Sequence, residues 1–192
     1  MIFMEQHRHF MLHKPYGILS QFVSEHDWKQ VLGVLYAFPE GTMPIGRLDE
    51  DSEGLLLLTT DGVQSERVRA KSLEKEYYAQ VDGRITAEAV ELLKQGVDIG
   101  IRGVKYRTRP CKVEILQSDP GFAPRTRKIR DDRHGPTTWI SITLSEGKNR
   151  QIRKMTAAVG FPTLRLFRVR IGDLELGDLK PGEVRETGPF VP

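Results

Sequence analysis

The sequence predicts a mixed α/β fold in which β-strands are interrupted by short helices. Residues 55–58 are four consecutive leucines, a short apolar run that is typical of a strand buried on both faces. A second set of residues, three of them apolar, recurs at helical spacing: Ile152, Met155, Thr156 and Val159. Gly160 and Pro162 then mark the end of this helix. A chain of 192 residues is long enough for one large domain or for two lobes that share a core.

In the N-terminal half, residues 10–13 predict a short strand that ends at Lys14-Pro15. Asp27 is the expected N-cap of a helix. One face of that helix would carry four apolar residues, which are Val31, Leu32, Leu35 and Tyr36. Asp61-Gly62, after the leucine run, predicts a turn or a cap.

Farther along the chain, residues 76–82 alternate as a strand does, with Tyr77 on one face and Tyr78 on the other. Thr86 is expected to cap a helix that ends before Gly96. Residues 138–144 predict another strand. Residues 117–136 form the clearest loop, because proline and glycine punctuate a charged segment that we expect to be flexible and basic.

Composition excludes several classes of protein. Cys111 is the only cysteine, so an intramolecular disulfide and a multi-cysteine zinc site are excluded, and its thiol is expected to be buried or half-buried. No segment reaches the ~20 apolar residues that a membrane span requires, and the N-terminus lacks a stretch of signal-peptide length. We therefore expect a cytoplasmic protein. The net charge of +3 and the pI near 9.0 favour a polyanionic partner only weakly.

The distribution of the charge is more informative. Between Gly147 and Gly172 there are seven cations and no acidic residue: Lys148, Arg150, Arg153, Lys154, Arg165, Arg168 and Arg170. The loop contributes a second cluster, diluted by two aspartates: Arg125, Arg127, Lys128, Arg130 and Arg133. A solvated charged face is the simplest alternative, but a stretch of a single sign favours contacts with nucleic-acid phosphates. Arginine also suits stacking on unpaired bases.

Residues 46–54 place four carboxylates directly before the leucine run: Asp49, Glu50, Asp51 and Glu53. An EF-hand is excluded because Thr60 occupies the twelfth position, where a bidentate glutamate is required. A magnesium site is disfavoured because adjacent loop positions seldom converge on one ion. An acidic surface turn remains the alternative to a functional motif.

The segment GRLDEDSEGLLLLTTDG, residues 46–62, resembles the signature of the pseudouridine synthases. Its form is that of the bacterial group that modifies ribosomal RNA, which comprises type A of the small ribosomal subunit and types B, E and F of the large one. Three further motifs match in the family's order: residues 13–17, 75–77 and 146–155. Only about ten residues precede the first motif, so the S4 RNA-binding domain of many members is expected to be missing. The chain is in this respect most similar to type E, and the resemblance implies one catalytic domain over residues 8–188.

This resemblance implies a pseudouridine synthase fold of the α+β class, with a mainly antiparallel central sheet split into two lobes around a basic active-site cleft. It also implies an enzyme that isomerises a specific uridine of ribosomal RNA, in a 23S stem-loop, to pseudouridine. The reaction needs no metal and no nucleotide cofactor, which agrees with the lack of a Walker loop or dinucleotide fingerprint in the sequence. A monomer is sufficient for it.

The resemblance also assigns roles to residues. Asp49 matches the family's catalytic aspartate, which acts either as a nucleophile on the sugar C1′ or as a base at C2′; the sequence leaves both open. Tyr77 matches the tyrosine that stacks on the target base, and Arg153 the basic residue that pairs with the carboxylate. Leu166 is a candidate wall of the pocket or ordinary core. Seven cations are expected to contact RNA: Arg47, Lys148, Arg150, Arg125, Arg127, Lys128 and Arg130.

The other residues of these motifs are expected to have simpler roles. Glu50, Asp51 and Glu53 are interpreted as solvated surface groups or local caps, and Lys14 and Pro15 as residues that shape a turn near the site. Two rival functions remain: a non-catalytic RNA-binding or ribosome-assembly protein with the same basic surface, and a metal-dependent nuclease.

Overall fold

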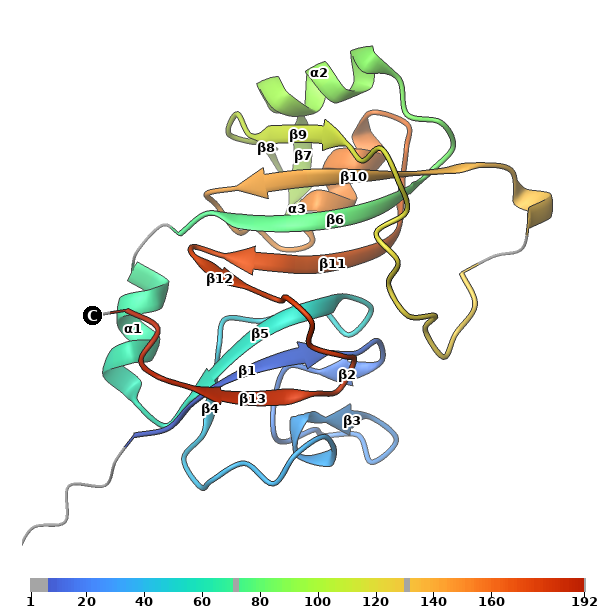
Figure 1. The fold of residues 1–192 in the computed structure, drawn as a ribbon. Helices are drawn as coiled ribbons and strands as arrows, with labels where there is room; N and C mark the ends of the chain where they lie inside the picture. The colour runs from blue at the N-terminus through green and yellow to red at the C-terminus, as the bar shows by residue number, and fades with distance from the viewer. Residues whose placement is uncertain (1–6, 71–72, 130–131, 192) are drawn as a thin grey trace, which may run out of the picture. The chain divides into compact units, whose positions relative to one another are not determined.

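The computed structural model describes residues 7–70, 73–129 and 132–191, and the chain divides into two compact units (Figure 1). Unit 1 contains residues 1–73 and 173–192, and unit 2 contains residues 74–172. Each unit is built on a sheet with antiparallel pairing, with helices elsewhere in the unit. The predicted α+β class with a mainly antiparallel sheet is therefore confirmed.

The elements of unit 1 are β1 (His9–Lys14), β2 (Ile18–Leu19), β3 (Gln30–Val31), the 3-10 helix η1 (Leu32–Val34), β4 (Met43–Ile45), β5 (Glu53–Thr59), α1 (Gly62–Ala70), β12 (Leu174–Glu175) and β13 (Val184–Thr187). Strand β1 lies between β13 and β5, and β4 also pairs with β5; all these pairings are antiparallel. The short strands β2 and β3 form a separate parallel pair. The C-terminal strand thus lies beside the first strand of the chain.

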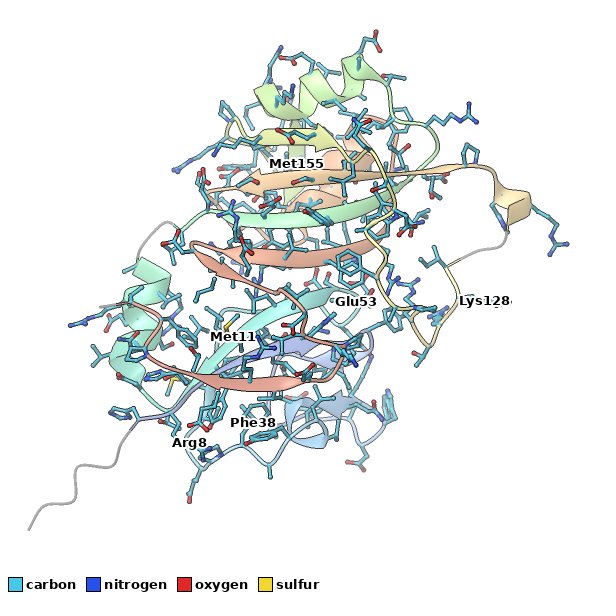
Figure 2. All side chains as sticks on the ribbon, viewed as in Figure 1. Arg8, Met11, Phe38, Glu53, Lys128 and Met155 are labelled. Carbon is cyan, nitrogen blue, oxygen red and sulfur yellow. The ribbon has the colours of Figure 1, made fainter. Side chains whose placement is uncertain are left out.

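The leucine run forms β5, and residues 53–59 of this strand are buried throughout, so the prediction of a doubly buried strand is confirmed. Leu56 and Leu58 lie opposite Leu12 and Phe10 of β1, and these residues share one core cluster with Ile18 and Leu32. Phe22, Leu35 and Phe38 pack against the same cluster, and Figure 2 labels Phe38 there. Each fully buried leucine contributes about 1.5–3 kcal/mol to stability.

The predicted helix that begins at Asp27 is wrong. Only the single 3-10 turn η1 forms in this segment, after the short strand β3. Contacts with distant parts of the chain replace helical hydrogen bonds, because the Leu32 amide donates to Gln21 O and the Lys29 ammonium binds Glu50. Leu32 and Leu35, two of the residues that suggested a helix face, instead pack in the core cluster of β1 and β5.

Helix α1 was not predicted as a helix, although the cap before it was. The Asp61 carboxylate accepts a hydrogen bond from the Val63 amide at 2.8 Å. The buried residues of α1 include Gln64 and Ser65, so the helix lacks an apolar stripe. Gln64 instead exchanges side-chain hydrogen bonds with the backbone of Val191, which fixes the C-terminal segment of unit 1.

The elements of unit 2 are β6 (Lys75–Asp82), α2 (Ala87–Gln95), β7 (Asp98–Ile101), β8 (Val104–Arg107), β9 (Lys112–Ile115), the 3-10 helix η2 (Asp132–His134), β10 (Thr137–Leu144), α3 (Gln151–Ala158) and β11 (Thr163–Ile171). Its sheet has the order β11-β6-β10-β9, and every pairing is antiparallel. Strands β7 and β8 form a separate hairpin. The predicted strands at 76–82 and 138–144 and the predicted helices at 86–95 and 152–159 are confirmed.

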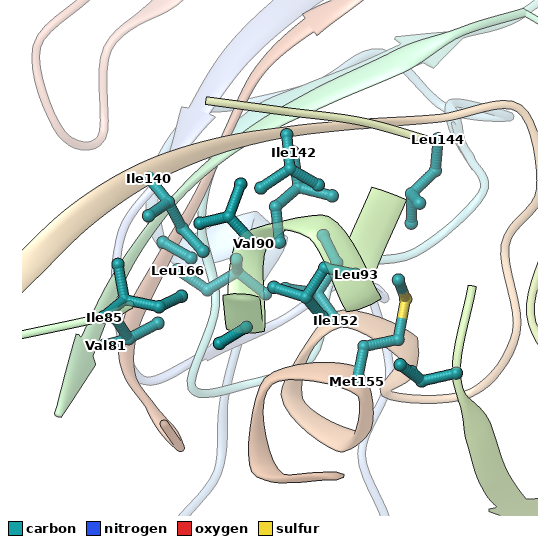
Figure 3. Close-up of a cluster of buried hydrophobic side chains, with 14 of the residues drawn as sticks. Val81, Ile85, Val90, Leu93, Ile140, Ile142, Leu144, Ile152, Met155 and Leu166 are labelled. Carbon is teal, nitrogen blue, oxygen red and sulfur yellow. The ribbon is translucent and has the colours of Figure 1, made fainter. Parts of the chain in front are cut away.

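One face of the unit 2 sheet packs against α2 and α3 (Figure 3). The Thr86 hydroxyl caps α2 by accepting a hydrogen bond from the Ala89 amide at 3.2 Å. At the other end of the helix, Gly96 has φ 89°, and an added Cβ would lie 2.2 Å from Thr108 O. Only glycine fits there, which explains why this helix ends where the sequence predicts.

The opposite face of the sheet carries Tyr78, Trp139 and Phe167, and Phe122 of the long loop between β9 and β10 covers them. Cys111 is half-buried as expected; burial raises the pKa of its thiol to about 11. Within the three described ranges, none of the helices has the length and hydropathy that a membrane span requires.

Candidate active site

The acidic motif of unit 1 forms the turn between β4 and β5. Gly46 with φ 73° and Gly54 with φ 103° bracket it, and both are left-handed conformations that favour glycine. Between them the Ser52 amide donates to Asp49 O at 3.0 Å, which closes a tight turn. Asp49 itself is half-buried. The motif's glycines therefore set the backbone path that presents Asp49.

Ser20 and Gln21 form a second segment that holds this turn by hydrogen bonds. The Ser20 hydroxyl donates to Leu48 O at 2.7 Å and accepts from Leu48 N at 3.0 Å. One residue earlier, the exposed Arg47 guanidinium donates to Gln21 Oε1 at 2.9 Å. Leu48, the residue before Asp49, thus has its backbone fixed by hydrogen bonds and its side chain buried.

Lys14, at the end of β1, is fully buried and fixes the residue after Asp49. Its ammonium donates to the carbonyl oxygens of Pro15 (2.9 Å), Ile18 (2.7 Å) and Glu50 (3.4 Å). The Gly17 amide also donates to Glu50 O, at 2.8 Å. Lys14 and Pro15 therefore lead into a turn beside the acidic motif, and Lys14 also binds that motif; their place near the site stays a prediction.

Burial lowers the pKa of Lys14 to about 8, although the neighbouring carboxylates, Glu53 foremost, oppose this shift. Glu53 is only 2% exposed, so the expectation that it is a surface group is wrong. It begins the fully buried strand β5, and the buried ammonium of Lys14 provides an opposite charge nearby. Glu50 is half-buried and forms an ion pair with Lys29 at 2.6 Å.

Unit 2 places Tyr77, Leu166 and Arg153 around one side of its sheet. Leu166 lies opposite Ala79 of β6, and strand alternation puts Tyr77 on the same face as Ala79. Both Tyr77 and Leu166 pack in the core cluster that includes Ile152 of α3. Arg153, the next residue of α3, donates to the carbonyl of Thr163 at the start of β11, at 3.3 Å.

Two cations, Arg168 of the basic stretch and Lys75 of the motif at 75–77, lie beside Tyr77, a position that the sequence did not predict. Arg168 lies directly opposite Tyr77 and is only 3% exposed. Lys75, two residues before Tyr77 on the same strand face, has a lowered pKa because of burial and the positive charge of Arg168. Alternation along β11 would have revealed Arg168, because it lies two residues from Leu166.

The segment before α3 displays Lys148 and Arg150, which are both exposed. Arg150 has φ 50°, a left-handed conformation that is uncommon for a residue with a side chain. The Lys148 ammonium lies over the Tyr106 ring, 4.9 Å from its centroid, and the Lys148 amide donates to Gln151 Oε1 at 2.9 Å. This turn is therefore ordered without a glycine at position 150.

Glu146 organises that turn. Its side chain is 7% exposed and accepts hydrogen bonds from Tyr106 Oη (2.5 Å), Arg109 N (3.0 Å) and Gln151 Nε2 (2.6 Å). Burial alone would raise the pKa of the Glu146 carboxyl, but these donors outweigh it and the pKa is lowered. The carboxylate thereby joins β8, the following loop and α3.

We expect Glu146→Gln to lower the free energy of unfolding by about 1–3 kcal/mol at pH 7, because the buried network loses its negative charge and one of its two acceptor oxygens. The carboxylate stabilises the fold above the unfolded glutamate pKa of about 4.3, and its contribution is lost as pH falls from there through the lowered folded pKa. Urea unfolding of both proteins at pH 7 and at acidic pH measures this. The exposed Glu114→Gln is the control, and an equal loss at both pH values would contradict the prediction.

The loop cations have mixed exposure. Arg127 and Lys128 are exposed, and Arg125 is half-buried with its Nε donating to Arg127 O at 2.8 Å. Arg130 lies outside the described residues. Among the residues that are described, no group of three or more His, Cys, Asp or Glu side chains is arranged to hold a metal ion.

The residues predicted for the site are divided between the two units. Unit 1 supplies Asp49 and Arg47 on one ordered turn. Unit 2 brings Tyr77, Leu166 and Arg153 to one side of its sheet, together with the ordered turn before α3.

These folded elements carry the motifs of RNA-isomerising enzymes, and comparison with known proteins identifies the class. The sequence model described as RNA pseudouridylate synthase matches residues 8–158, so the chain belongs to this family and is an RNA pseudouridine synthase. It is 43% identical over 178 residues to the ribosomal large subunit pseudouridine synthase E of Vibrio parahaemolyticus, which covers 92% of this chain and 72% of that protein. The protein of the same name from Xanthomonas axonopodis is 42% identical over 174 residues, 89% of each chain.

A solved structure agrees with this assignment. The crystal structure of a pseudouridylate synthase superimposes with a TM-score of 0.75 at 30% sequence identity, over 97% of this chain and 72% of that chain. The predicted pseudouridine synthase fold is therefore confirmed, and the two relatives confirm the predicted similarity to type E.

Proposed function

We propose that this chain converts one uridine of large-subunit ribosomal RNA, in a 23S stem-loop, to pseudouridine, with Asp49 as the catalytic carboxylate. The observation that carries the proposal is the turn of Asp49, which is fixed by Leu48 on one side and Glu50 on the other. A half-buried carboxylate on such a turn suits chemistry better than a solvated surface turn does. The name shared by the two relatives supports ribosomal RNA as the substrate.

The reaction breaks the bond between uracil N1 and ribose C1′, rotates the base and joins its C5 to C1′. Substrate and product have the same composition, so no oxidant or second substrate is consumed. Asp49 can attack C1′ as a nucleophile or remove the proton from C2′, and both roles require the ionised carboxylate. When the new bond forms, the proton on C5 leaves to solvent and N1, freed from the sugar, takes up a proton from solvent, so the composition is unchanged.

The target nucleotide must leave the base stack before this chemistry, so the enzyme needs a pocket with a stacking surface. We assign stacking to the ring of Tyr77 and one wall to Leu166, which share a face of the unit 2 sheet. Arg153 is the proposed partner of the Asp49 carboxylate. Its guanidinium is already oriented by the carbonyl of Thr163.

The remaining cations are proposed to bind the phosphates of the RNA backbone. On unit 2 these are Lys148 and Arg150 before α3, and Arg125, Arg127, Lys128 and Arg130 in the loop, while unit 1 contributes Arg47. Contacts of this kind release counterions, so RNA affinity should fall steeply as salt increases.

The test is to incubate the purified protein with unmodified 23S RNA transcript and map pseudouridine by carbodiimide adducts that stop reverse transcription. We expect conversion of one uridine in a stem-loop, with no shortening of the RNA and no conversion in 16S transcript. RNA that is bound but unconverted would indicate a non-catalytic binding protein. Cleaved RNA that is protected by a chelator would indicate a nuclease, and either result would overturn the proposal.

A further inference from the structure

The loop between β9 and β10 was expected to be flexible, yet its first half is packed against the unit 2 sheet. In Figure 1 it is the yellow segment that leaves β9, and Figure 2 labels Lys128 on it. The Phe122 ring stacks on Phe167 of β11, with centroids 3.7 Å apart and 13° between planes. It also lies 5.8 Å from Trp139 of β10 and 6.2 Å from Tyr78 of β6.

These three aromatic residues come from three adjacent strands and share one face. Phe167 lies directly opposite Tyr78, and Trp139 lies opposite Gln80, two residues farther along β6. Residues at such positions point to the same side of the sheet. They face away from the Tyr77 side, so Phe122 fills an aromatic surface that the proposed chemistry does not use.

A buried arginine strengthens this attachment. Arg165 is 6% exposed, and its guanidinium lies 4.5 Å from the Phe167 centroid while donating to Ala123 O at 2.6 Å. On the other side of Phe122, the Asp119 carboxylate accepts from the Gly121 amide at 2.7 Å. Gly121 and Ala123, the two neighbours of Phe122, are therefore both fixed by hydrogen bonds. Arg125, Arg127 and Lys128 follow within six residues of Phe122.

We propose that Phe122 is a positioning residue for RNA binding: it anchors the loop so that Arg125, Arg127 and Lys128 are presented to the RNA backbone in a fixed arrangement. This inference rests on the proposed function, because it takes RNA as the ligand. A free loop of like charges must lose conformational entropy when RNA binds, which weakens affinity. An anchored loop has lost most of that entropy before the RNA arrives.

The first test examines the anchor without RNA. Phe122→Ala should accelerate trypsin cleavage after Arg127 and Lys128 and change the fluorescence of Trp139, measured in a Trp28→Phe background because Trp28 is the only other tryptophan. Phe122→Tyr keeps the stacked ring and should behave as the parent protein does. Unchanged cleavage in Phe122→Ala would show that the loop does not depend on this ring.

The second test asks whether the anchor serves RNA binding. Phe122→Ala should raise KM for the RNA about tenfold, as expected for a lost aromatic pair that organises several contacts, and leave kcat within about twofold. Phe122→Tyr should restore KM. A general structural defect would instead lower kcat and the urea midpoint, and would not be limited to KM.

A double-mutant cycle connects the ring to the cations. Replacing Arg127 and Lys128 by alanine should raise KM in the parent protein, but much less in the Phe122→Ala background, because these residues are no longer positioned there. The inference is wrong if the effects of Phe122→Ala and of the two cation replacements on KM simply multiply. It is also wrong if Phe122→Ala accelerates trypsin cleavage of the loop while KM is unchanged. If the parent protein forms no pseudouridine, the proposed function fails instead, so the two failures are distinct.

Discussion

Asp49→Asn should abolish pseudouridine formation and leave RNA affinity and folding intact. Asparagine has the same shape but no negative charge, and neither the nucleophilic nor the general-base route works without the carboxylate. Loss of a positioned catalytic group of this kind lowers the rate by about 10²–10⁴-fold. Release of tritium from RNA that carries [5-³H]uridine measures the reaction directly, because C5 loses its hydrogen when it forms the bond to C1′.

The matched control is Asp51→Asn, which makes the same chemical change two residues away on the same turn. We expect this variant to stay within a few-fold of the parent rate, since Asp51 is assigned no part in the chemistry. RNA affinity is compared at one fixed salt concentration, because charge changes on a nucleic-acid-binding protein alter its salt dependence. Activity in Asp49→Asn, or equal losses in both variants, would remove Asp49 from its proposed role.

Local pattern was sufficient to predict several core elements, among them β5, β6, β10 and α3. Because a strand of four consecutive leucines points apolar side chains to both faces of a sheet, both faces must be covered, and β5 is buried throughout. The alternation before Asp82 predicted β6 and the helical spacing after Arg150 predicted α3, because both the strand period and the helix period place one set of apolar residues on one face. In each case the information lies within ten residues of sequence.

The failures share a different cause, which is contact between distant residues. The segment from Asp27 to Tyr36 carries helical spacing, but its residues contact Gln21 and Glu50 and cover a sheet. In the sequence, Phe122 is likewise a single aromatic residue in a polar loop, and only the fold brings the aromatic residues of β6, β10 and β11 to it. No local period records these contacts.

The candidate site shows the same division. Motif resemblance pointed to Asp49, Tyr77 and Arg153 by residue type and spacing. It did not reveal that Lys14 is fully buried under the acidic turn, because its acceptors include a carbonyl 36 residues away in the chain. It also did not reveal Arg168 opposite Tyr77, which depends on the register between β6 and β11.

The buried ammonium of Lys14 predicts an unusual dependence of stability on pH. Its pKa falls from 10.5 in the unfolded chain to about 8 in the folded protein, chiefly because of burial. Between these values the unfolded chain binds more protons than the folded one, so stability rises with pH. Below about pH 8 the ammonium is charged in both states, and the full cost of burying its charge is present.

Lys14→Met keeps the aliphatic stem and removes the titrating group, so comparison with the parent protein isolates this effect. From pH 7.5 to pH 10.5 we expect the parent to gain about 3 kcal/mol of unfolding free energy relative to the variant. Urea unfolding at several pH values measures the difference. Lys29→Met, which removes the other ammonium bound by Glu50, is the control; as a partner in a surface ion pair it should change stability by less than about 1 kcal/mol.

The variant also tests how the acidic turn is held. Methionine cannot donate to the carbonyls of Ile18 and Glu50, so the turn that carries Asp49 loses its support from β1. We therefore expect Lys14→Met to lower kcat at neutral pH more than it raises KM, because the chemistry depends on the carboxylate's position while RNA contacts lie elsewhere. Parallel pH profiles of stability in parent and variant, with kcat unchanged, would show that Lys14 neither bears a buried charge nor orders the turn.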